Sequence, residues 1–251
     1  MGWRRAVVTG ASSGIGKAMV EHLAEQGTPV VMVARSAERM EEVAEGLDVD
    51  SEILPADLGT PEGIAAVAAR LASEDDPIDL LVNNAGFGHH GAFAEDGVER
   101  QQGMVDLNVS ALVQLTHAAA SVMSERAGGT ILNVSSVAGA TAAPNFAVYA
   151  ATKAFVTSFS QGLHEELREH GVVVSCLAPG LTRTEFQDRA AYDSSKLPDF
   201  AWQTAAEVAA AGLEGASKGK AMIVPGAQNK MMLGGVKLLP EAVKRRIAAA
   251  I

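Results

Sequence analysis

The chain has 251 residues, of which 48% are hydrophobic and 20% charged, and a formal net charge of −10 at pH 7. This length allows one substantial core, and the negative charge argues against a nucleic-acid partner, whose phosphates would be repelled. No segment reaches the roughly 18 uninterrupted apolar residues of a membrane span, and the N-terminus leaves no room for a signal peptide. The single cysteine, Cys176, excludes an internal disulfide, so we expect a cytoplasmic protein.

Short apolar runs alternate along the chain with longer segments of helical periodicity. Strands are expected at residues 5–9, 30–34, 51–54, 78–83, 130–135, 172–178 and 221–225. Helices are expected at residues 15–25, 37–45, 61–72, 98–125, 147–170 and 204–217. The strands are hydrophobic almost throughout, which is typical of parallel strands covered on both faces. The pattern predicts an α/β fold, a Rossmann-type doubly wound sheet of about seven parallel strands between two helical layers, in one domain over residues 1–251.

A glycine-rich turn follows the first expected strand. Gly10, Gly14 and Gly16 have the spacing Gly-x-x-x-Gly-x-Gly immediately before a helix. Gly10 permits a tight turn, Gly14 lets the backbone approach a pyrophosphate, and Gly16 lets the helix lie close to the strand. Because free N–H groups at a helix N-terminus attract phosphate, the turn predicts a dinucleotide site, with a ligand-free turn as the alternative. The expected contacts are Gly10, Ser12, Ser13, Gly14, Ile15 and Gly16.

The end of the second strand indicates which dinucleotide binds. A NAD site would place Asp or Glu there to hold the ribose 2′-hydroxyl, whereas this chain has Ala34-Arg35-Ser36. The planar guanidinium of Arg35 can pair with a 2′-phosphate, aided by Ser12, and Arg39 is a second candidate. We therefore expect NADP(H) to be preferred over NAD(H). The alternative is that Arg35 is only a solvated charge at a helix start.

Tyr149 and Lys153 are four residues apart in the fifth expected helix, so they lie on one face of it. A tyrosine ordinarily titrates near about 10, and a close ammonium favours the phenolate. Lowering that pKa by roughly two to three units takes about 3–4 kcal/mol, which one partly desolvated ammonium can supply. With Ser136 thirteen residues upstream, the pair indicates an acid/base catalyst; alone, such a pair is more often a surface contact.

Several short motifs follow one another in order along the chain. They are Thr9-Gly-Ala-Ser-Ser-Gly-Ile-Gly16, Asn83-Asn-Ala-Gly86, Asn108, Asn133-Val-Ser-Ser136, Tyr149-x-x-x-Lys153 and Pro179-Gly180. As an ordered set covering nearly the whole chain, they resemble the short, single-domain branch of the short-chain dehydrogenase/reductase superfamily. Within it, Asn84-Ala-Gly-Phe-Gly88 and the segments that begin at Tyr149 and Pro179 are similar to a bacterial DltE-like or ketoacyl-reductase-like subgroup. That kinship specifies no substrate.

The resemblance implies catalytic roles for individual residues. Tyr149 would donate the proton in reduction and accept it in oxidation, because hydride addition to a ketone builds negative charge on its oxygen. Lys153 would lower the pKa of Tyr149 and bind the nicotinamide ribose. Ser136 would hold the substrate oxygen; Ser135 is its rival, but the thirteen-residue gap to Tyr149 in the family selects Ser136. Asn108, within the long fourth helix, would anchor a water that relays protons toward Lys153.

The resemblance also implies cofactor contacts at the ends of later strands. They are Asp57, Asn84, Ala85, Gly86, Pro179, Gly180, Thr182 and Thr184. Asp57 would accept a hydrogen bond from the adenine amino group, the alternative being a helix cap. Residues 84–86 would lie along the adenosine ribose, while Asn83 would brace the central strands. The backbone of Thr182 and the hydroxyl of Thr184 would hold the nicotinamide carboxamide, the alternative for Thr184 being a solvated loop position.

Segment 185–202 interrupts the alternation of strands and helices. Long irregular loops at the carboxyl edge of such a sheet are often lids, with an ordinary surface loop as the alternative. Its apolar residues, which favour a hydrophobic substrate, are Phe186, Tyr192, Leu197, Phe200 and Trp202. We expect Phe87 and Phe186 to contact the substrate. His89 and His90 lack the companions that a metal site needs, so no metal is expected.

Residues 237–251 combine apolar and basic side chains at helical spacing. We expect an amphipathic helix that serves subunit contact or core packing, with peripheral membrane contact as the alternative. The family resemblance implies a homodimer or homotetramer, with the subunit surface on helices 98–125 and 147–170.

The sequence thus predicts an NADP(H)-dependent oxidoreductase that transfers a hydride between nicotinamide and a ketone or secondary alcohol. Two other functions remain open. One is a non-catalytic dinucleotide sensor or scaffold, against which the intact set of Ser136, Tyr149 and Lys153 argues. The other is a sugar-nucleotide epimerase, which usually has a larger C-terminal substrate domain than the stretch after Pro179 allows.

Overall fold

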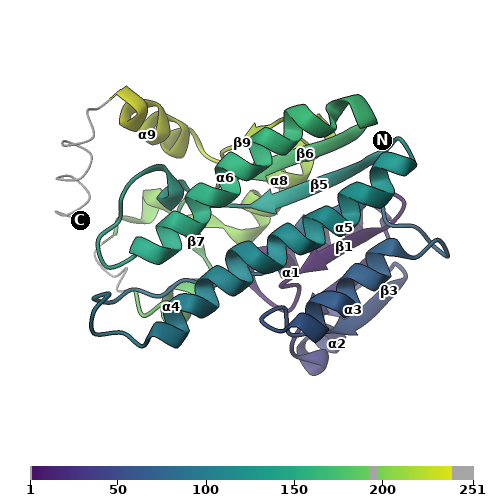
Figure 1. Ribbon diagram of the computed structural model, residues 1–251, viewed down its shortest axis with the longest axis horizontal. Helices are drawn as coiled ribbons and strands as arrows, with labels where there is room; N and C mark the ends of the chain where they lie inside the picture. The colour runs from purple at the N-terminus through teal and green to yellow at the C-terminus, as the bar shows by residue number, and fades with distance from the viewer. Residues whose placement is uncertain (1, 193–196, 239–251) are drawn as a thin grey trace.

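The computed structural model describes residues 2–192 and 197–238, and its centre is a seven-stranded parallel sheet in the order β3-β2-β1-β4-β5-β6-β9 (Figure 1). The strands are β1 (Ala6–Thr9), β2 (Val30–Ala34), β3 (Ser51–Pro55), β4 (Leu80–Asn83), β5 (Gly129–Val134), β6 (Val172–Leu177) and β9 (Met222–Ile223). This confirms the expected doubly wound fold. The strand order reverses between β1 and β4, and sheets of this type bind ligands in a crevice beyond the carboxyl ends of the strands at such a reversal.

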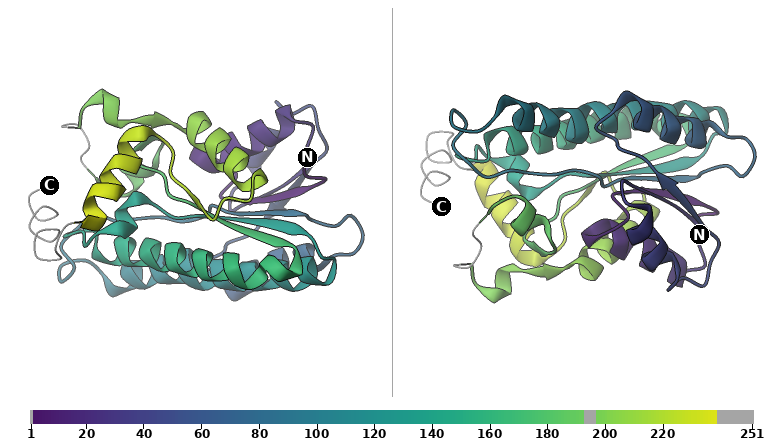
Figure 2. Two further views of the ribbon diagram at one scale, coloured as in Figure 1. Left: turned by 90° about the horizontal axis from the view of Figure 1, so that it is seen from above. Right: turned by 90° about the horizontal axis from the view of Figure 1, so that it is seen from below.

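Helices cover both faces of the sheet, as the hydrophobic character of the strands requires. The principal helices are α1 (Gly14–Glu25), α2 (Ala37–Ala44), α3 (Pro61–Ala72), α4 (Val98–Val105), α5 (Leu112–Glu125), α6 (Ala147–Leu167), α8 (Ala205–Ser217) and α9 (Ala227–Leu238). One core lies between the sheet and α1, α2 and α8, and the other between the sheet and α3, α5 and α6. Figure 2 shows the sheet edge-on between these two layers. None of the helices within the described ranges is long and apolar enough to cross a bilayer.

The expected helical stretch at 98–125 is confirmed, but its middle is not α-helical. A π-helix at Asp106–Ala111 separates α4 from α5. Asn108 lies in this stretch, and its side chain bonds the main chain of Phe87. The wider turn accommodates a polar side chain that reaches across to another loop, as π-bulges at functional sites commonly do. The sequence periodicity alone could not show this insertion.

Segment 185–202 contains more regular structure than expected. It begins with the short helix α7 (Phe186–Arg189) and includes a 3-10 turn at Asp199–Ala201. It is flanked by β7 (Thr182–Arg183) and β8 (Gln203–Thr204), which form a separate two-stranded parallel sheet. The expected amphipathic helix at 237–251 lies outside the described residues beyond 238. The helix α9, which precedes that position, was not predicted.

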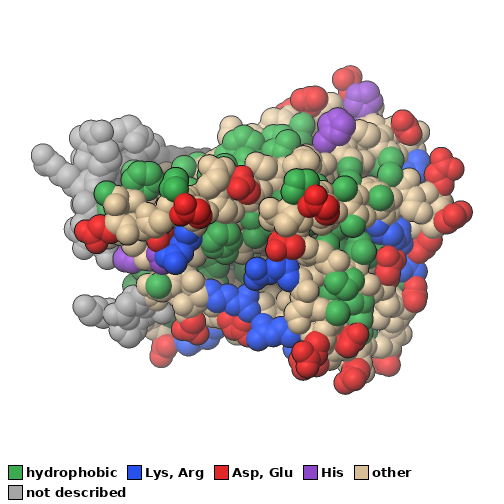
Figure 3. Space-filling model, turned by 60° about the horizontal axis from the view of Figure 1, so that its bottom comes forward, with side chains coloured by type: hydrophobic (Ala, Val, Ile, Leu, Met, Phe, Trp, Pro, Cys, Tyr) green, Lys and Arg blue, Asp and Glu red, His purple; other side chains and the backbone are tan. Residues whose placement is uncertain are grey.

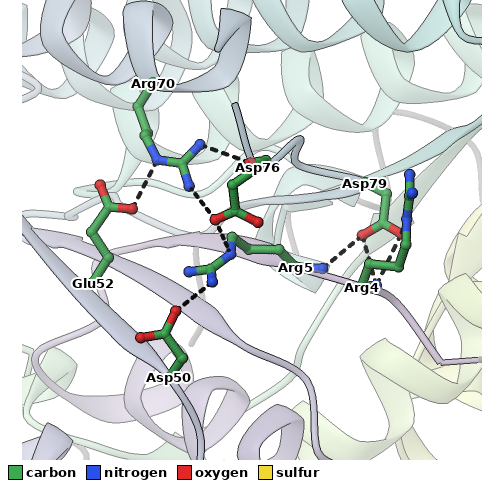
Figure 4. A network of polar contacts seen from close by, with 7 residues as sticks. All are labelled: Arg4, Arg5, Asp50, Glu52, Arg70, Asp76 and Asp79. Atoms are coloured by element: carbon green, nitrogen blue, oxygen red, sulfur yellow. Dashed lines mark hydrogen bonds and ion pairs between the residues drawn. The ribbon is translucent and has the colours of Figure 1, made fainter. Parts of the chain in front are cut away.

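An ion-pair network ties together the amino ends of the strands, at the end of the sheet opposite the crevice. Arg5, immediately before β1, pairs with Asp50 and Asp76. Arg70 of α3 joins the same Asp76 to Glu52. Figure 4 shows the full set, Arg4, Arg5, Asp50, Glu52, Arg70, Asp76 and Asp79. These contacts fix where the strands begin, so they support the fold and are remote from the crevice.

Candidate active site

Three polar side chains meet at the carboxyl end of β5. Ser136 follows the strand, and its hydroxyl accepts a 3.1 Å hydrogen bond from the Ala138 amide. Tyr149 and Lys153 come from the first two turns of α6 and are 8% and 5% exposed. Hydrogen bonding by Ser136 favours the phenolate form of Tyr149. The structure therefore brings the predicted trio together in a largely dehydrated corner.

The ammonium of Lys153 is directed at the main chain of β5. Its Nζ donates a 2.9 Å hydrogen bond to the Val134 carbonyl and lies 5.8 Å from the centroid of the Tyr149 ring. Burial lowers the pKa of Lys153 to about 8, because dehydration disfavours the ammonium, and a neighbouring Cys176 partly opposes this.

The expectation of a lowered tyrosine pKa is wrong for this structure. Burial raises the pKa of Tyr149 to about 12, because the phenolate loses its hydration, and the hydrogen bond from Ser136 offsets only part of this. The groups that lower this pKa do not include Lys153, whose ammonium donates to the Val134 carbonyl and lies 5.8 Å from the centroid of the tyrosine ring. The phenol is therefore protonated at neutral pH.

Asn108 fastens the loop after β4 to the rest of the site. Its Nδ2 donates to the Phe87 carbonyl at 2.8 Å and to the Thr152 hydroxyl at 3.1 Å, while its Oδ1 accepts from the Phe87 amide at 3.0 Å. A Cβ on Gly86 would lie 2.8 Å from Asn108 Oδ1 and 3.5 Å from Lys153 Nζ. Glycine at 86 thus lets both side chains approach this loop. The role of Asn108 in holding a water stays a prediction.

The glycine turn has the close approaches that its spacing predicts. Gly10 and Gly14 have positive φ angles of 67° and 57°. A Cβ on Gly16 would lie 2.2 Å from the Gly10 carbonyl oxygen. Asn84 stabilises the turn, because its Nδ2 donates to the Thr9 carbonyl at 2.9 Å. These contacts require glycine where the chain passes between β1 and α1.

The N-terminus of α1 fits a phosphate group. In the described part of the chain, Ser13 at its N-cap makes no side-chain capping bond, and the first turn of α1 has no acidic residue. By contrast, α2 and α3 are capped by Ser36 and Thr60. Amide groups left uncapped at a helix N-terminus can donate to an anion. Figure 3 shows Lys and Arg side chains at the rim of a hollow, in a chain whose net charge is −10.

The predicted contacts of the adenosine half lie at the ends of β2 and β3. Arg35 follows β2 directly and is exposed. Arg39, the second candidate, pairs with Glu185 of the predicted lid at 3.4 Å. Asp57 is exposed, and its Oδ1 accepts a 2.9 Å bond from the Gly59 amide. Among the residues that the structure describes, Arg39 forms an ion pair with the lid and Arg35 does not.

The segment after β6 lies against the glycine turn. A Cβ on Gly14 would lie 3.3 Å from the Thr184 methyl group. The hydroxyl of Thr184 accepts from the Phe186 amide at 3.2 Å. Thr182 is buried, and its hydroxyl donates to the Gly180 carbonyl at 3.0 Å. The Pro179 carbonyl accepts from the Val137 amide at 3.0 Å. The predicted nicotinamide contacts therefore line the same crevice as the turn.

Aromatic rings surround Tyr149 on the side away from β5. The centroids of Phe146 and Phe186 lie 5.2 and 5.4 Å from that of Tyr149. His90 and Tyr192 pack behind Phe146, at 5.3 and 5.7 Å. We call these four residues, Phe146, Phe186, Tyr192 and His90, the aromatic cover. Its residues come from three segments: the connection between β5 and α6, the predicted lid, and the loop after β4.

Phe87 does not join the aromatic cover, although a substrate contact was expected there. No aromatic pair within residues 2–192 and 197–238 includes it. Its ring packs against α4, where a Cβ on Gly103 would lie 3.5 Å from its Cζ. The neighbouring Gly88 is the position that contacts Tyr149 and Phe186.

Comparisons with known proteins agree with this geometry. The family model "short chain dehydrogenase" matches residues 4–194. The chain belongs to the short-chain dehydrogenase family. An uncharacterised oxidoreductase of Staphylococcus epidermidis is 32% identical over 200 residues, which are 77% of this chain and 87% of the relative. The superfamily expected from the motifs is thereby confirmed, while the DltE-like subgroup stays a prediction.

Two solved structures are similar to this chain over most of their length. One, from Sphingobium yanoikuyae in complex with NADPH, has a TM-score of 0.83 and 34% identity, and 95% of this chain and 97% of that chain are covered. The other, a bulky-bulky ketone specific alcohol dehydrogenase from Comamonas testosteroni, has a TM-score of 0.80 and 32% identity, with 95% and 96% covered.

Sequence reasoning about this short-chain dehydrogenase missed residues that act through the main chain. The carbonyl of Val134 holds the Lys153 ammonium, and no side-chain motif could indicate it. Thr152 donates to the Tyr149 carbonyl at 2.7 Å. Phe146 is the N-cap of α6, and its position three residues before Tyr149 was a usable signal for contact between the two rings. Within the described ranges, no group of three or more His, Cys, Asp or Glu residues is arranged to hold a metal ion.

Proposed function

We propose that this protein is an NADP(H)-dependent oxidoreductase that interconverts hydrophobic ketones and secondary alcohols. One observation carries the proposal: the buried phenol of Tyr149 lies with Ser136 and Lys153 at the carboxyl end of β5. A bound nicotinamide dinucleotide supplies the hydride. The protein's own residues supply the binding, the orientation and the proton.

Tyr149 acts as the proton donor in reduction. A phenol whose pKa is raised by burial keeps its proton at neutral pH until negative charge develops on the substrate oxygen. Ser136 holds that oxygen beside the phenol. Lys153 binds the nicotinamide ribose. To do so, its ammonium gives up the hydrogen bond to the Val134 carbonyl and reaches the ribose by a short movement of the side chain. Asn108 anchors the water through which the proton on Tyr149 is replaced.

The cofactor contacts follow the crevice from α1 to β7. The uncapped amides of residues 13–16 take the pyrophosphate, and Arg35 takes the 2′-phosphate. Residues 84–86 lie along the adenosine ribose, and Asp57 accepts from adenine. Thr182 and Thr184 take the carboxamide beside Pro179 and Gly180. The preference for NADP(H) is supported by Arg35 and by the NADPH bound to the Sphingobium relative.

The proposed substrate is a ketone with apolar substituents. The aromatic cover adjoins Tyr149, and its ring faces favour flat or bulky hydrocarbon groups. The name of the Comamonas relative, specific for bulky-bulky ketones, supports the same class. A panel of ketones of graded size tests this; a preference for small polar sugars would contradict it.

Homo-oligomerisation and a cytoplasmic location belong to the same proposal. An apolar groove of about 620 Å³ runs along α4 and α6, and Phe93 and Phe155 at its rim are 64% and 40% exposed. The groove supports a homodimer or homotetramer, which sedimentation analysis would detect. The lone buried Cys176 is compatible with a reducing compartment.

Tyr149→Phe tests the proposal directly. The change removes one hydroxyl from a ring that stays in place, so NADPH should still bind while ketone-dependent NADPH oxidation falls by at least about 1,000-fold, or about 4 kcal/mol in the barrier. NADPH fluorescence measures binding, and absorbance of NADPH measures turnover. Substantial turnover by the variant would refute the role of Tyr149.

A further inference from the structure

The main-chain carbonyl of Lys153 lies against two hydroxyls, one on the buried Ser135 and one on the half-buried Thr157. Ser135 Oγ donates to it at 2.7 Å and Thr157 Oγ1 at 3.1 Å, and the two hydroxyl oxygens are themselves 2.7 Å apart. Ser135 is 3% exposed. In an α-helix the Lys153 carbonyl oxygen already accepts a hydrogen bond from the amide of residue 157. A hydroxyl that also donates to this oxygen uses the second lone pair of the oxygen.

Two hydroxyl protons cannot satisfy all three of these contacts at once. The shortest distances fit a chain in which Thr157 donates to Ser135 and Ser135 donates to the Lys153 carbonyl. The thiol of Cys176, 3.9 Å from Thr157 Oγ1, supplies a donor at the start of this chain. Each acceptor in this chain then has one donor, and the final acceptor is the main-chain carbonyl of Lys153.

A second close contact acts on the same peptide group. A Cβ on Gly139 would lie 2.6 Å from the Lys153 carbonyl carbon and 2.9 Å from its oxygen. The 3-10 turn Val137–Ala140 therefore packs directly on α6 at this point. The position of Lys153 along the helix is thus set from the loop as well as from the strand end.

Consecutive residues at the end of β5 contact three parts of the catalytic helix. The Val134 carbonyl holds the Lys153 ammonium, Ser135 holds the Lys153 carbonyl, and Ser136 interacts with the Tyr149 phenol. A small rotation or slide of α6 would change all three distances together. Misplacement of a catalytic group by about 1 Å can cost 10²-fold in rate.

We propose that Ser135, with Thr157, is a positioning residue that fixes α6 so that Lys153 and Tyr149 stay aligned with Ser136. This inference rests on the proposed function, since alignment matters only if the trio is catalytic. It assigns Ser135 a task different from the one for which it rivalled Ser136, because its hydroxyl faces the helix backbone and not the phenol.

The chain offers a matched control in Ser160. It lies on the same helix and is fully buried, with its hydroxyl bonded to Asn133 at 3.0 Å and to the Val156 carbonyl at 2.7 Å. Because it bonds Asn133 of β5, Ser160→Ala also removes a buried hydroxyl from the contact between β5 and α6. It lies seven residues beyond Lys153 and so is separate from the trio of Ser136, Tyr149 and Lys153. Loss of the Ser160 hydroxyl should lower the stability of the protein but leave the alignment of Ser136, Tyr149 and Lys153 unchanged.

The experiment compares Ser135→Ala, Ser135→Thr and Ser160→Ala in the full-length protein. Ser135→Ala should lower kcat by about tenfold or more, with the Kd of NADPH changed less than about twofold, and Ser135→Thr should restore most of kcat. Ser160→Ala should unfold at a lower denaturant concentration than the wild type, as Ser135→Ala does, but keep kcat. Unchanged kcat in Ser135→Ala, or an equal loss in Ser160→Ala, would overturn the proposal.

A readout independent of turnover separates this proposal from the proposed function. The chain has two tyrosines, so ¹³C-labelled tyrosine resolves the titration of Tyr149 by NMR. Ser135→Ala should shift its pKa by about half a unit or more, and Ser160→Ala should not. If that pattern holds while the wild type reduces no ketone, the proposed reaction fails and the positioning role is retained. If neither variant shifts the titration, the positioning role fails.

Discussion

The ammonium of Lys153 donates a 2.9 Å hydrogen bond to the main-chain carbonyl of Val134, in a corner where the lysine is 5% exposed. A carbonyl is neutral, so this bond does not balance the charge that burial dehydrates. The result is a lysine whose pKa falls to about 8. Its charge state is therefore sensitive to pH near the physiological range.

Burial of Lys153 should make stability depend on pH. The folded-state pKa of about 8 is below the ordinary value of 10.5, so between these values the unfolded chain binds more protons and the free energy of unfolding rises with pH. Lys153→Met should remove a rise of up to about 3 kcal/mol between about pH 8 and pH 10. Urea denaturation across this window measures it.

The window ends near pH 10 because Tyr149 then acts in the opposite direction. Its pKa is raised from 10.0 to about 12, so the folded protein keeps a proton that the unfolded chain loses, and stability falls as pH increases further. Lys218→Met, which removes a lysine whose side chain is 57% exposed, is the control and should retain the wild-type profile. A flat wild-type profile would contradict the buried charge.

A methyl group at position 88 should disturb the aromatic cover. A Cβ on Gly88 would lie 2.8 Å from Phe186 Cζ and 3.0 Å from Tyr149 Cδ2. Gly88→Ala should therefore displace Phe186 and lower kcat/KM for ketones by about tenfold. The double variant Gly88→Ala/Phe186→Ala should recover part of the loss. Without any recovery, the ring of Phe186 is not the cause.

Removal of Arg35 should change cofactor choice. A charge-assisted bond to a phosphate contributes about 1.5–3 kcal/mol, so Arg35→Ala should raise the KM for NADPH by about tenfold or more and leave that for NADH unchanged. Arg39→Ala is the comparison and should have a smaller effect, because Arg39 pairs with Glu185. An unchanged NADPH/NADH ratio in Arg35→Ala would refute the assignment.

The ion-pair network at the far end of the sheet should affect stability alone. The Arg5 side chain is 11% exposed and pairs with Asp50 and Asp76, which are 69% and 53% exposed and can rehydrate. Arg5→Met should therefore cost about 1–2 kcal/mol in denaturant titrations and leave kcat unchanged. Arg4→Met removes a side chain that is 74% exposed and should cost close to nothing. Equal losses would show that burial of Arg5 is unimportant.

Local spacing in the sequence predicted the fold class, the glycine turn and the common helix face of Tyr149 and Lys153. Alternation of apolar runs with helical periods predicted the doubly wound sheet, because each pattern depends on neighbouring residues only. The glycine spacing predicted the turn, and the four-residue interval of Tyr149 and Lys153 placed them on one helix face. Asn83 was also predicted correctly as a brace, since its Nδ2 bonds Asn133 of β5.

Only the tertiary structure decided how these residues are charged and held. The pKa of Tyr149 depends on how much water the surrounding elements exclude, so the sequence prediction had the wrong sign. The partner of Lys153 is a main-chain carbonyl, which every residue possesses and no motif can indicate. The π-turn at Asn108 and the packing of Phe186 on Tyr149 likewise join segments distant in the chain. Such contacts follow from packing between elements, which residue spacing within one element does not contain.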